Sequence, residues 1–351
     1  MKHAPRHRVA IFTVLLALVA GCDRKPKLVP PSGADSTATG QDSVSVLSRE
    51  AARQWEGGHA EEAAAITARA VRARLEADPS DGWAERARGL LDDMSVGSEV
   101  AGSGTATVVN LFSRAEADGG SWPYLFWNEG GSVRMQPLEG RGMRLLDMSV
   151  REFSAGSAGD SSQVAVLWGR RGPAGQQPLL LTWRHARGGR WDLAQTLGPD
   201  SLGGTGSGQF DDRALVTRTF RATPMFDECA TCPHVYRERR FYWGPAGFAR
   251  NDDRVVPSPY ATFTSFVGSL VDGDREQAQR YVADPSLVEF ARRYEWHDAA
   301  LGRWRAAPGT EATAPEMVFF RGRSDAFRVT FQPRGAGWVV LGFEATARSV
   351  E

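Results

Sequence analysis

The sequence predicts a multidomain fold with an N-terminal α-helical hairpin, a central all-β domain and a C-terminal α+β domain. Three observations predict it. Residues 43–96 are rich in Ala, Glu, Arg and Leu, whereas 97–256 alternates short apolar runs with clusters of Gly, Pro, Asn and Asp. Residues 257–351 show helical patterns first and strand patterns afterwards. A chain of 351 residues is long enough for two or three domains.

The N-terminus precedes these domains and has the pattern of a secretory signal. Basic residues stand at positions 2, 6 and 8, and an uncharged apolar run from Val9 to Ala20 leads into Gly21-Cys22. The run is shorter than the roughly 20 residues that a membrane-spanning helix needs. Val19-Ala20-Gly21-Cys22 resembles the lipobox of bacterial lipoproteins. The resemblance implies that residues 1–21 are removed, that the Cys22 thiol receives diacylglycerol, and that its freed amine is acylated. The alternative is an ordinary signal with a chance cysteine.

Residues 22–42 predict a lipidated tether, because proline, glycine and small polar residues dominate and too few apolar groups are available to pack. The expected location is the cell envelope, on the periplasmic or exterior side of a membrane. Membrane lipid, held through the acyl anchor, is the one partner that the sequence predicts directly. The sequence does not decide between the inner and the outer membrane.

Charge and lysine content exclude several classes of function. The whole chain has 42 basic and 42 acidic residues, so the chain without residues 1–21 has 39 and 42, a net charge of −3. A nucleic-acid-binding protein would show a basic excess. The only lysines are Lys2, Lys25 and Lys27. The folded part therefore cannot contain a Walker phosphate loop, a kinase lysine, a Schiff-base lysine or a Ser-x-x-Lys nucleophile.

The helical segment 43–96 is interrupted at Gly57-Gly58 and at Asp78-Pro79. An apolar stripe at steps of three and four residues predicts two packed helices, and a third is expected near 83–94. Residues 58–79 resemble part of a tetratricopeptide repeat. The segment departs from that pattern because Thr67 replaces the usual aromatic residue and only one unit is present, whereas solenoids need about three.

Eight candidate strands fall in the central domain, at 105–112, 122–127, 132–137, 163–168, 178–184, 190–196, 214–222 and 234–243. A strand ending in tryptophan, then a glycine-containing turn and a second strand, occurs three times, at Trp127, Trp183 and Trp243. The pattern could mark fragments of propeller blades. Its irregularity favours a sandwich or an open barrel. The glycine-rich segment 202–208 is expected to be a flexible loop.

The C-terminal domain begins at Ser258-Pro259, a good N-cap followed by proline at the first helical position. Three helices are expected over 259–294, followed by strands at 316–321, 327–332 and 338–344. Residues 266–274 are similar to the first helices of small lipoproteins of the nuclear-transport-factor-like cone superfamily. That resemblance implies a cone-like α+β fold but no particular activity, because the superfamily includes enzymes and non-catalytic modules. The expected core is Phe263, Phe266, Leu270, Phe290, Phe319, Phe331, Val339 and Leu341.

Cys229 and Cys232 form the most specific local cluster of metal-binding or redox-active side chains, and His234 follows two residues later. A structural disulfide that pins a loop is the favoured interpretation, since an even pair of cysteines remains in an oxidising compartment. A zinc site would need a fourth ligand, and a redox dithiol would lack the strand-to-helix context of thioredoxin-like sites. A buried, inert bond would exclude the redox alternative.

Two further sets carry polar groups. Tyr294, Trp296 and His297, with neighbouring carboxylates, could face a pocket in the C-terminal domain and suit acid–base chemistry. The acidic runs 211–212 and 251–253 could hold calcium, but they match no EF-hand loop and are expected to be solvated turns.

The favoured function is non-catalytic binding or scaffolding at the envelope, without a cofactor and with envelope proteins as possible partners. The alternative is an enzyme or small-ligand binder that uses a pocket in the C-terminal domain. A deep pocket lined by His297 and a carboxylate would favour the alternative, whereas an interior filled by aromatic rings would favour the binding module.

Overall fold

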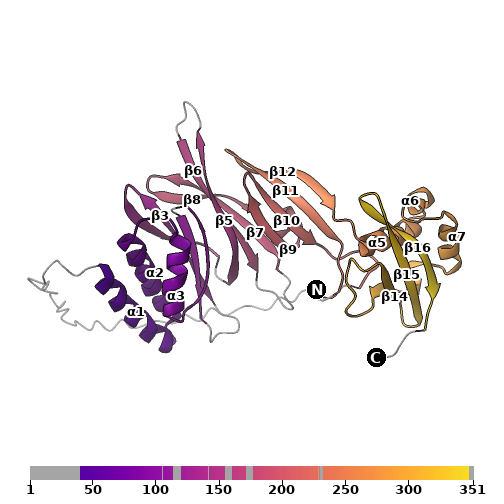
Figure 1. Cartoon of the computed structure of the whole chain (residues 1–351), viewed down its shortest axis with the longest axis horizontal. Helices are drawn as coiled ribbons and strands as arrows, with labels where there is room; N and C mark the ends of the chain where they lie inside the picture. The colour runs from indigo at the N-terminus through magenta and orange to yellow at the C-terminus, as the bar shows by residue number, and fades with distance from the viewer. Residues whose placement is uncertain are drawn as a thin grey trace, which may run out of the picture. The chain divides into compact units, whose positions relative to one another are not determined.

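The computed structural model describes residues 40–104, 106–113, 120–140, 142–154, 160–170, 177–227, 229 and 232–347. The predicted signal and most of the predicted tether lie outside the described residues. A helical segment comes first, antiparallel sheets follow, and a few further helices stand near the C-terminus, as Figure 1 shows. This coarse layout confirms the predicted order of helical, β and mixed segments. No described helix is both long enough and apolar enough to cross a membrane.

Three helices open the described chain: α1 (Gly40–Glu56), α2 (Ala60–Ala77) and α3 (Trp83–Asp93). The breaks between them fall at Gly57-Gly58 and around Pro79, as the sequence predicts. Thr67, which replaces the usual aromatic residue of the repeat pattern, is buried and accepts a hydrogen bond from Trp55 Nε1 at 3.1 Å. The Thr67 hydroxyl on α2 therefore satisfies the indole N–H of Trp55 on α1.

The strands form four antiparallel sheets, each made of four consecutive strands. Sheet 1 contains β1 (Gly97–Ser103), β2 (Ala106–Phe112), β3 (Ser121–Glu129) and β4 (Ser132–Pro137). Sheet 2 contains β5 (Met143–Ser154), β6 (Asp160–Arg170), β7 (Leu179–Arg187) and β8 (Arg190–Leu197). Sheet 3 follows the short helix α4 (Pro199–Leu202) and contains β9 (Thr205–Asp211), β10 (Ala214–Phe220), β11 (Tyr236–Gly244) and β12 (Gly247–Val255). Sheet 4 belongs to the C-terminal unit.

Sheets 1, 2 and 3 share one topology, the four-stranded meander of a propeller blade. Each tryptophan of the repeated sequence pattern lies on the third strand of its sheet: Trp127 on β3, Trp183 on β7 and Trp243 on β11. The glycine turn after each one joins the third strand to the fourth. The pattern therefore marks a repeated structural unit that occurs in three successive sheets.

The three meanders pack face to face through two separate layers of apolar side chains. One layer lies between sheets 1 and 2 and includes Val108, Leu125 and Trp168. The other lies between sheets 2 and 3 and includes Leu181, Leu215 and Trp243. The far face of sheet 1 packs against α2 and α3 in a third cluster. Sheet 2 is thus buried on both faces.

The expectation of a flexible loop at 202–208 is wrong, because Thr205–Asp211 forms strand β9. The glycines of β9 allow neighbouring atoms to approach the strand closely. A Cβ at Gly206 would lie 2.2 Å from the carbonyl oxygen of Arg218, and one at Gly208 would lie 2.9 Å from the Leu167 side chain. Glycine weakens a strand unless a neighbour approaches closely, and here neighbours do.

Side-chain acceptors tie the first strands of successive sheets together. Glu99 of β1 accepts a hydrogen bond from the backbone N–H of Leu145 in β5, at 2.6 Å. Asp147 of β5 accepts one from the backbone N–H of Phe210 in β9, at 2.8 Å. In both interfaces, an acidic side chain on the first strand of one sheet therefore accepts a hydrogen bond from a backbone N–H on the first strand of the next sheet.

The fourth strands repeat this arrangement with glutamine. Gln136 of β4 accepts a hydrogen bond from the backbone N–H of Trp191 in β8 at 3.0 Å, and Gln195 of β8 accepts one from Phe248 in β12 at 3.1 Å. Half-buried polar groups that are satisfied in this way help to fix how two surfaces meet, because another arrangement would leave them unpaired. The two interfaces between sheets thus use one scheme.

A third tie crosses the middle of the layer between sheets 2 and 3. Gln163 of β6 is buried, and its Oε1 accepts hydrogen bonds from Trp183 Nε1 and Trp243 Nε1, both at 2.8 Å. Its amide nitrogen donates to the Pro245 carbonyl at 2.9 Å. Two tryptophans of the repeated pattern therefore share one acceptor.

The C-terminal unit combines α5 (Pro259–Val271), α6 (Arg275–Arg280), α7 (Ser286–Arg293) and a short 3-10 helix (Ala299–Leu301) with sheet 4. Sheet 4 contains β13 (Trp304–Ala306), β14 (Glu316–Arg321), β15 (Asp325–Arg334) and β16 (Gly337–Ala345). Ser258 caps α5 by accepting from the Ala261 N–H at 3.1 Å, as predicted. Six of the eight expected core residues are buried. The other two are wrong: Phe290 is 37% exposed, and Leu341, at a bulge of β16, is 51% exposed.

Candidate functional site

Aromatic rings fill the interior of the C-terminal unit, where the sequence places a pocket. Trp296 is 1% exposed, and the centre of its ring lies 4.2 Å from that of Phe343, 5.0 Å from Phe327 and 5.1 Å from Trp304. Phe263 stacks on Phe319 at 3.8 Å in the same cluster. Rings at these separations leave no room for a substrate between them.

The three predicted pocket residues lie in different surroundings. Tyr294 lines a hollow of about 380 Å³ at one end of the cluster. Trp296 is a core residue, and His297 is half-buried and does not line this hollow. The hollow is lined by Arg293, Tyr294, Glu295, Arg321, Ser324, Asp325, Ala326, Phe327, Ala345 and Thr346.

Arg321 is the charged group at the base of this hollow. Its side chain is 4% exposed and pairs with the Asp325 carboxylate, with Nη2 at 2.5 Å and Nε at 3.1 Å from Oδ2. Its Nη1 donates to the carbonyl of Glu295 at 2.8 Å. Because Glu295 has a positive φ of 57°, rare for a residue with a side chain, Arg321 holds a strained turn in place.

The charges at the hollow do not form an acid–base pair. The hydrogen bond from Arg321 is the main cause that keeps the pKa of Asp325 below its usual value, so this carboxyl is ionised at neutral pH. A general acid needs a pKa near the working pH, and a lowered carboxyl pKa moves away from it. The arrangement suits recognition of a polar group better than proton transfer.

A second hollow, of about 300 Å³, lies where the end of α1 meets sheet 1. Its apolar lining comes from Trp55, Met94, Val96 and Phe112. Tryptophan and methionine at a recessed surface are typical of protein contact sites.

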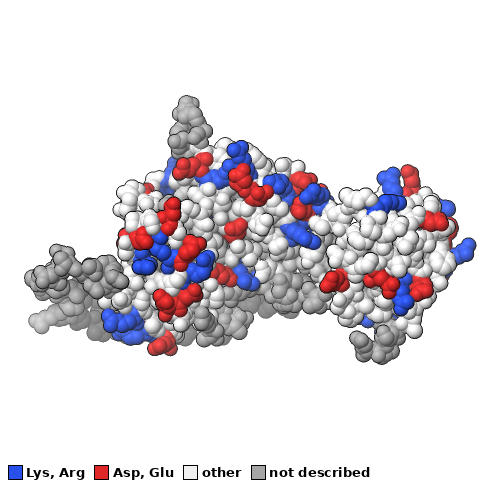
Figure 2. Space-filling model, in the orientation of Figure 1, with Lys and Arg blue, Asp and Glu red and all other residues white. Residues whose placement is uncertain are grey.

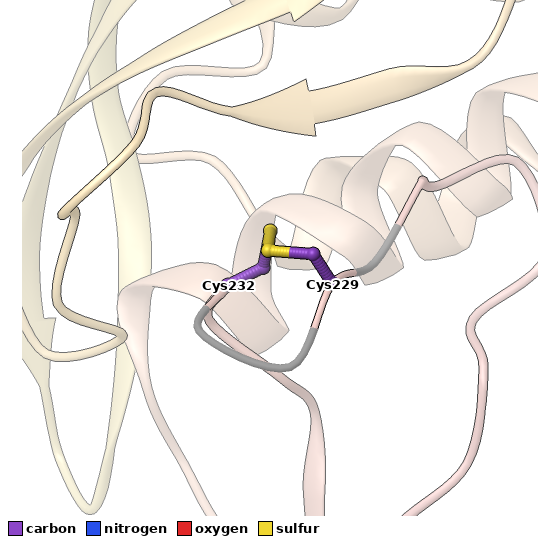
Figure 3. Close-up of a disulfide and its surroundings, with 2 residues drawn as sticks. All are labelled: Cys229 and Cys232. Carbon is purple, nitrogen blue, oxygen red and sulfur yellow. A yellow bond between two sulfur atoms is a disulfide. The ribbon is translucent and has the colours of Figure 1, made fainter. Parts of the chain in front are cut away.

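Cys229 and Cys232 form a disulfide with their Cα atoms 4.9 Å apart, as Figure 3 shows. They lie on the segment that connects β10 to β11, residues 221–235, which we call the strap. The strap leaves β10 after Phe220 and returns to β11 at Tyr236. At its base, the His234 ring stacks on Phe220 with centres 3.7 Å apart.

The strap enters the aromatic cluster of the C-terminal unit. Phe226 is 1% exposed, and its ring lies 5.9 Å from Tyr260 and 6.0 Å from Phe263. The backbone N–H of Asp227 donates to Trp304 O at 2.7 Å, and the Trp304 N–H donates to the carbonyl of the residue before Phe226 at 2.8 Å. Phe226 therefore forms an isolated parallel bridge to Trp304 of β13.

The acidic runs are partners of arginine. Asp211 pairs with Arg240 at 2.7 Å, and Asp253 pairs with Arg237 at 2.7 Å and Arg239 at 3.1 Å. Burial alone would raise the pKa of Asp253, but the hydrogen bonds and charges of the two arginines outweigh it and lower that pKa. Within the part of the chain that the structure describes, no three His, Cys, Asp or Glu side chains are grouped to hold a metal ion.

Acidic and basic residues alternate over the face of the molecule shown in Figure 2, without a broad basic area there. No family model, curated protein or solved structure matches this chain. The family resemblances at the lipobox, the helical segment and the C-terminal unit therefore stay predictions.

Sequence reasoning missed three residues that define these sites: Arg321, Asp325 and Phe226. A signal was present for each. Arg321 ends one predicted strand and Asp325 comes just before the next, so a short hairpin brings their opposite charges together. Phe226 belongs to an apolar pair in an otherwise polar loop, which indicates an anchor with no local partner.

Proposed function

We propose that this protein is a lipid-anchored protein of the bacterial cell envelope that binds or scaffolds other envelope proteins without catalysing a reaction. In this proposal Cys22 carries the lipid, residues 23–42 form the tether, and the helices, sheets and C-terminal unit form the exported binding part. The C-terminal unit is proposed to be a cone-like α+β domain in which aromatic residues have replaced the cavity.

The observation that carries the non-catalytic proposal is the filled interior around Trp296. The rings of Phe263, Trp304 and Phe327 occupy the space that a catalytic cavity would need. The charged pair beside it, Arg321 and Asp325, is mutually neutralised. Three packed meanders and a helical layer supply a large rigid surface, which suits binding.

The anchor is tested by Cys22→Ser. One acyl chain gives only marginal membrane binding, so a lipoprotein carries more than one. We expect the variant to leave the membrane fraction or to keep its signal, with the mass change measured by mass spectrometry. A Cys22→Ser protein that stays in the membrane fraction at the wild-type mass would contradict the proposed lipid anchor.

The binding role is tested by photo-crosslinking in cells, with a benzophenone amino acid at Ala52, which lines the hollow beside Trp55. The matched control position is Leu193, which is 43% exposed on β8. We expect a discrete crosslinked protein from position 52 and none from position 193. Identical patterns from both positions, or none from either, would count against a specific partner at this surface.

The alternative, a small-ligand binder, is favoured by the hollow at Tyr294 and Arg321. It predicts that some polar small molecule raises the melting temperature of the wild-type protein but not of Tyr294→Ala. A metabolite screen by thermal shift that finds no such molecule leaves the scaffold as the better proposal.

A further inference from the structure

The hollow where α1 meets sheet 1 has a composition that selects one kind of partner. It measures about 300 Å³, and its apolar lining comes from Trp55, Met94, Val96 and Phe112. Among the described residues that line it, Glu56 is the only one with a charged side chain. An apolar base beside a carboxylate fits side chains that bury an apolar stem and keep a positive charge at the end, as arginine does.

We propose that this hollow binds a segment of an envelope protein in which an arginine stands next to a large apolar residue. The apolar residue fills the base of the hollow, and the arginine pairs with Glu56 at its edge. The inference rests on the proposed binding role and adds the chemistry of the partner to it.

Trp55 is held in place before a partner arrives. Its Nε1 donates to the Thr67 hydroxyl at 3.1 Å, and its ring meets that of Trp122 edge to face, with the centres 5.8 Å apart. The residue is half-buried, so part of it stays open to the hollow. A tryptophan that is already ordered loses little freedom on binding, and its ring attracts a guanidinium placed over it more strongly than other aromatic rings do.

The turn after α3 forms another wall, and backbone hydrogen bonds fix it. Ser95 N–H donates to Asp92 O at 2.9 Å, and Val96 N–H donates to Leu91 O at 3.1 Å. Ser95 has a positive φ of 54°, which lets the chain turn sharply from the helix into β1. The turn therefore holds Met94 and Val96 at the hollow in the free protein, and binding does not have to order them.

The charges at this end of the helices favour a cation. Glu56 is exposed and forms no ion pair within the described part of the chain, because Arg53, the basic residue in the last turn of α1, pairs with Glu50. Asp93, the last residue of α3, is also exposed and has no ion pair among the described residues. Both carboxylates stand at the C-terminal end of a helix, where the partial negative charge of the helix adds to theirs. A basic side chain is therefore attracted to the hollow, and an acidic one is repelled.

The first test extends the crosslinking at position 52 in cells. Glu56→Gln removes the charge and keeps the shape of the side chain. The matched control is Glu62→Gln, the same change at an exposed position of α2 that does not line the hollow. We expect Glu56→Gln to weaken the crosslink and Glu62→Gln to leave it unchanged. The crosslinked peptide, sequenced by mass spectrometry, should carry an arginine beside a large apolar residue.

The second test uses that peptide, synthesised and titrated calorimetrically into the full mature protein in detergent. An exposed ion pair is worth a factor of up to about 5 in affinity, so Glu56→Gln should raise Kd about 1.5- to 5-fold. The difference should disappear in 1 M salt, which screens charges beyond about 3 Å. Met94→Ala, which truncates the lining, should raise Kd by about 5-fold or more at any salt concentration. Circular dichroism checks that each variant folds.

The outcomes separate this inference from the binding role. No crosslink from position 52 in the otherwise unchanged protein would overturn both. A crosslink that Glu56→Gln leaves at full strength, or that Glu62→Gln weakens equally, would overturn the inference alone. So would a crosslink between two copies of this chain, a crosslinked peptide without a basic residue, or a Kd that Glu56→Gln and Met94→Ala leave unchanged.

Discussion

Phe226→Ala probes whether the strap supports the C-terminal core. The side chain is 1% exposed, and it meets the rings of Tyr260 and Phe263 edge to face. Full burial of a phenylalanine side chain is worth about 1.5–3 kcal/mol. Truncation also leaves a cavity among rigid rings that cannot collapse, so the total loss should be about 3–5 kcal/mol.

Urea unfolding followed by tryptophan fluorescence measures this loss, because Trp296 and Trp304 lie in the same cluster. The matched control is Phe290→Ala, the same truncation at a residue of the C-terminal unit that is 37% exposed. We expect the control to cost clearly less. If Phe226→Ala lowers the free energy of unfolding by under 1 kcal/mol, or by no more than Phe290→Ala does, the strap is not part of the core.

The same reasoning bears on the predicted domain boundary at residue 257. A fragment from Val256 to Glu351 contains the helices and sheet 4 but lacks Phe226. We expect this fragment to fold. Its free energy of unfolding should be lower than that of the same unit in the whole chain, by the amount that Phe226→Ala costs. A fragment that unfolds cooperatively at the full-chain urea midpoint would show that Phe226 adds nothing.

Three further predictions concern polar side chains. Gln163→Leu removes the acceptor of two buried indole N–H groups, each worth about 1–3 kcal/mol when left unpaired, so urea unfolding should show a loss of about 2–6 kcal/mol. Arg184 is 3% exposed, burial lowers its pKa, and its guanidinium donates a hydrogen bond to the Thr182 hydroxyl. Because a buried charge costs free energy, Arg184→Met should raise the free energy of unfolding by about 1–4 kcal/mol. A lower free energy of unfolding in this variant would show that the charge is compensated in the folded protein. The pKa of Asp325 lies below its usual 3.8 in the folded protein, so the unfolded chain binds this proton more tightly. Stabilisation by the pair with Arg321 should be present above about pH 4 and lost as the pH falls through the folded pKa, and an acid-unfolding slope that Asp325→Asn leaves unchanged would contradict this.

Local chemistry accounts for the elements that the sequence predicts well. Strands β4 and β14 have the predicted bounds, because turn residues flank both of them and side chains alternate in β4. Strand β9 could not be found in this way. Its glycines signal a loop, and only the crowding by Arg218 of the neighbouring strand β10 and by Leu167 of β6 in the sheet packed against it explains them.

Tertiary contacts account for the errors at the candidate site. The segment around Trp296 has the polar neighbours of a pocket, yet its indole lies among rings from α5, β13, β15 and β16. Arg321 and Asp325 could be paired from the hairpin that joins their strands. Phe226 could not be placed, since its partners follow it by 34 residues or more in the chain and nothing local orients it.

The repeated ties between sheets explain where the series of meanders ends. Gln195 comes directly after a bulge in β8, and Asp252 comes directly after the corresponding bulge in β12. Gln195 accepts a backbone N–H from the next sheet, whereas Asp252 is an exposed residue facing Arg240 across the strand pair.

Around Asp252, this face of sheet 3 carries ion pairs between Arg240 and Asp211 and between Arg254 and Glu238. Charged side chains satisfied within one sheet resist burial against another, because stacking would strip their water without offering new partners. The opposite end of the series is covered by α2 and α3. Repeat arrays need such polar or covered ends to stay soluble, so helices at one end and an ion-paired sheet at the other limit the array to three meanders.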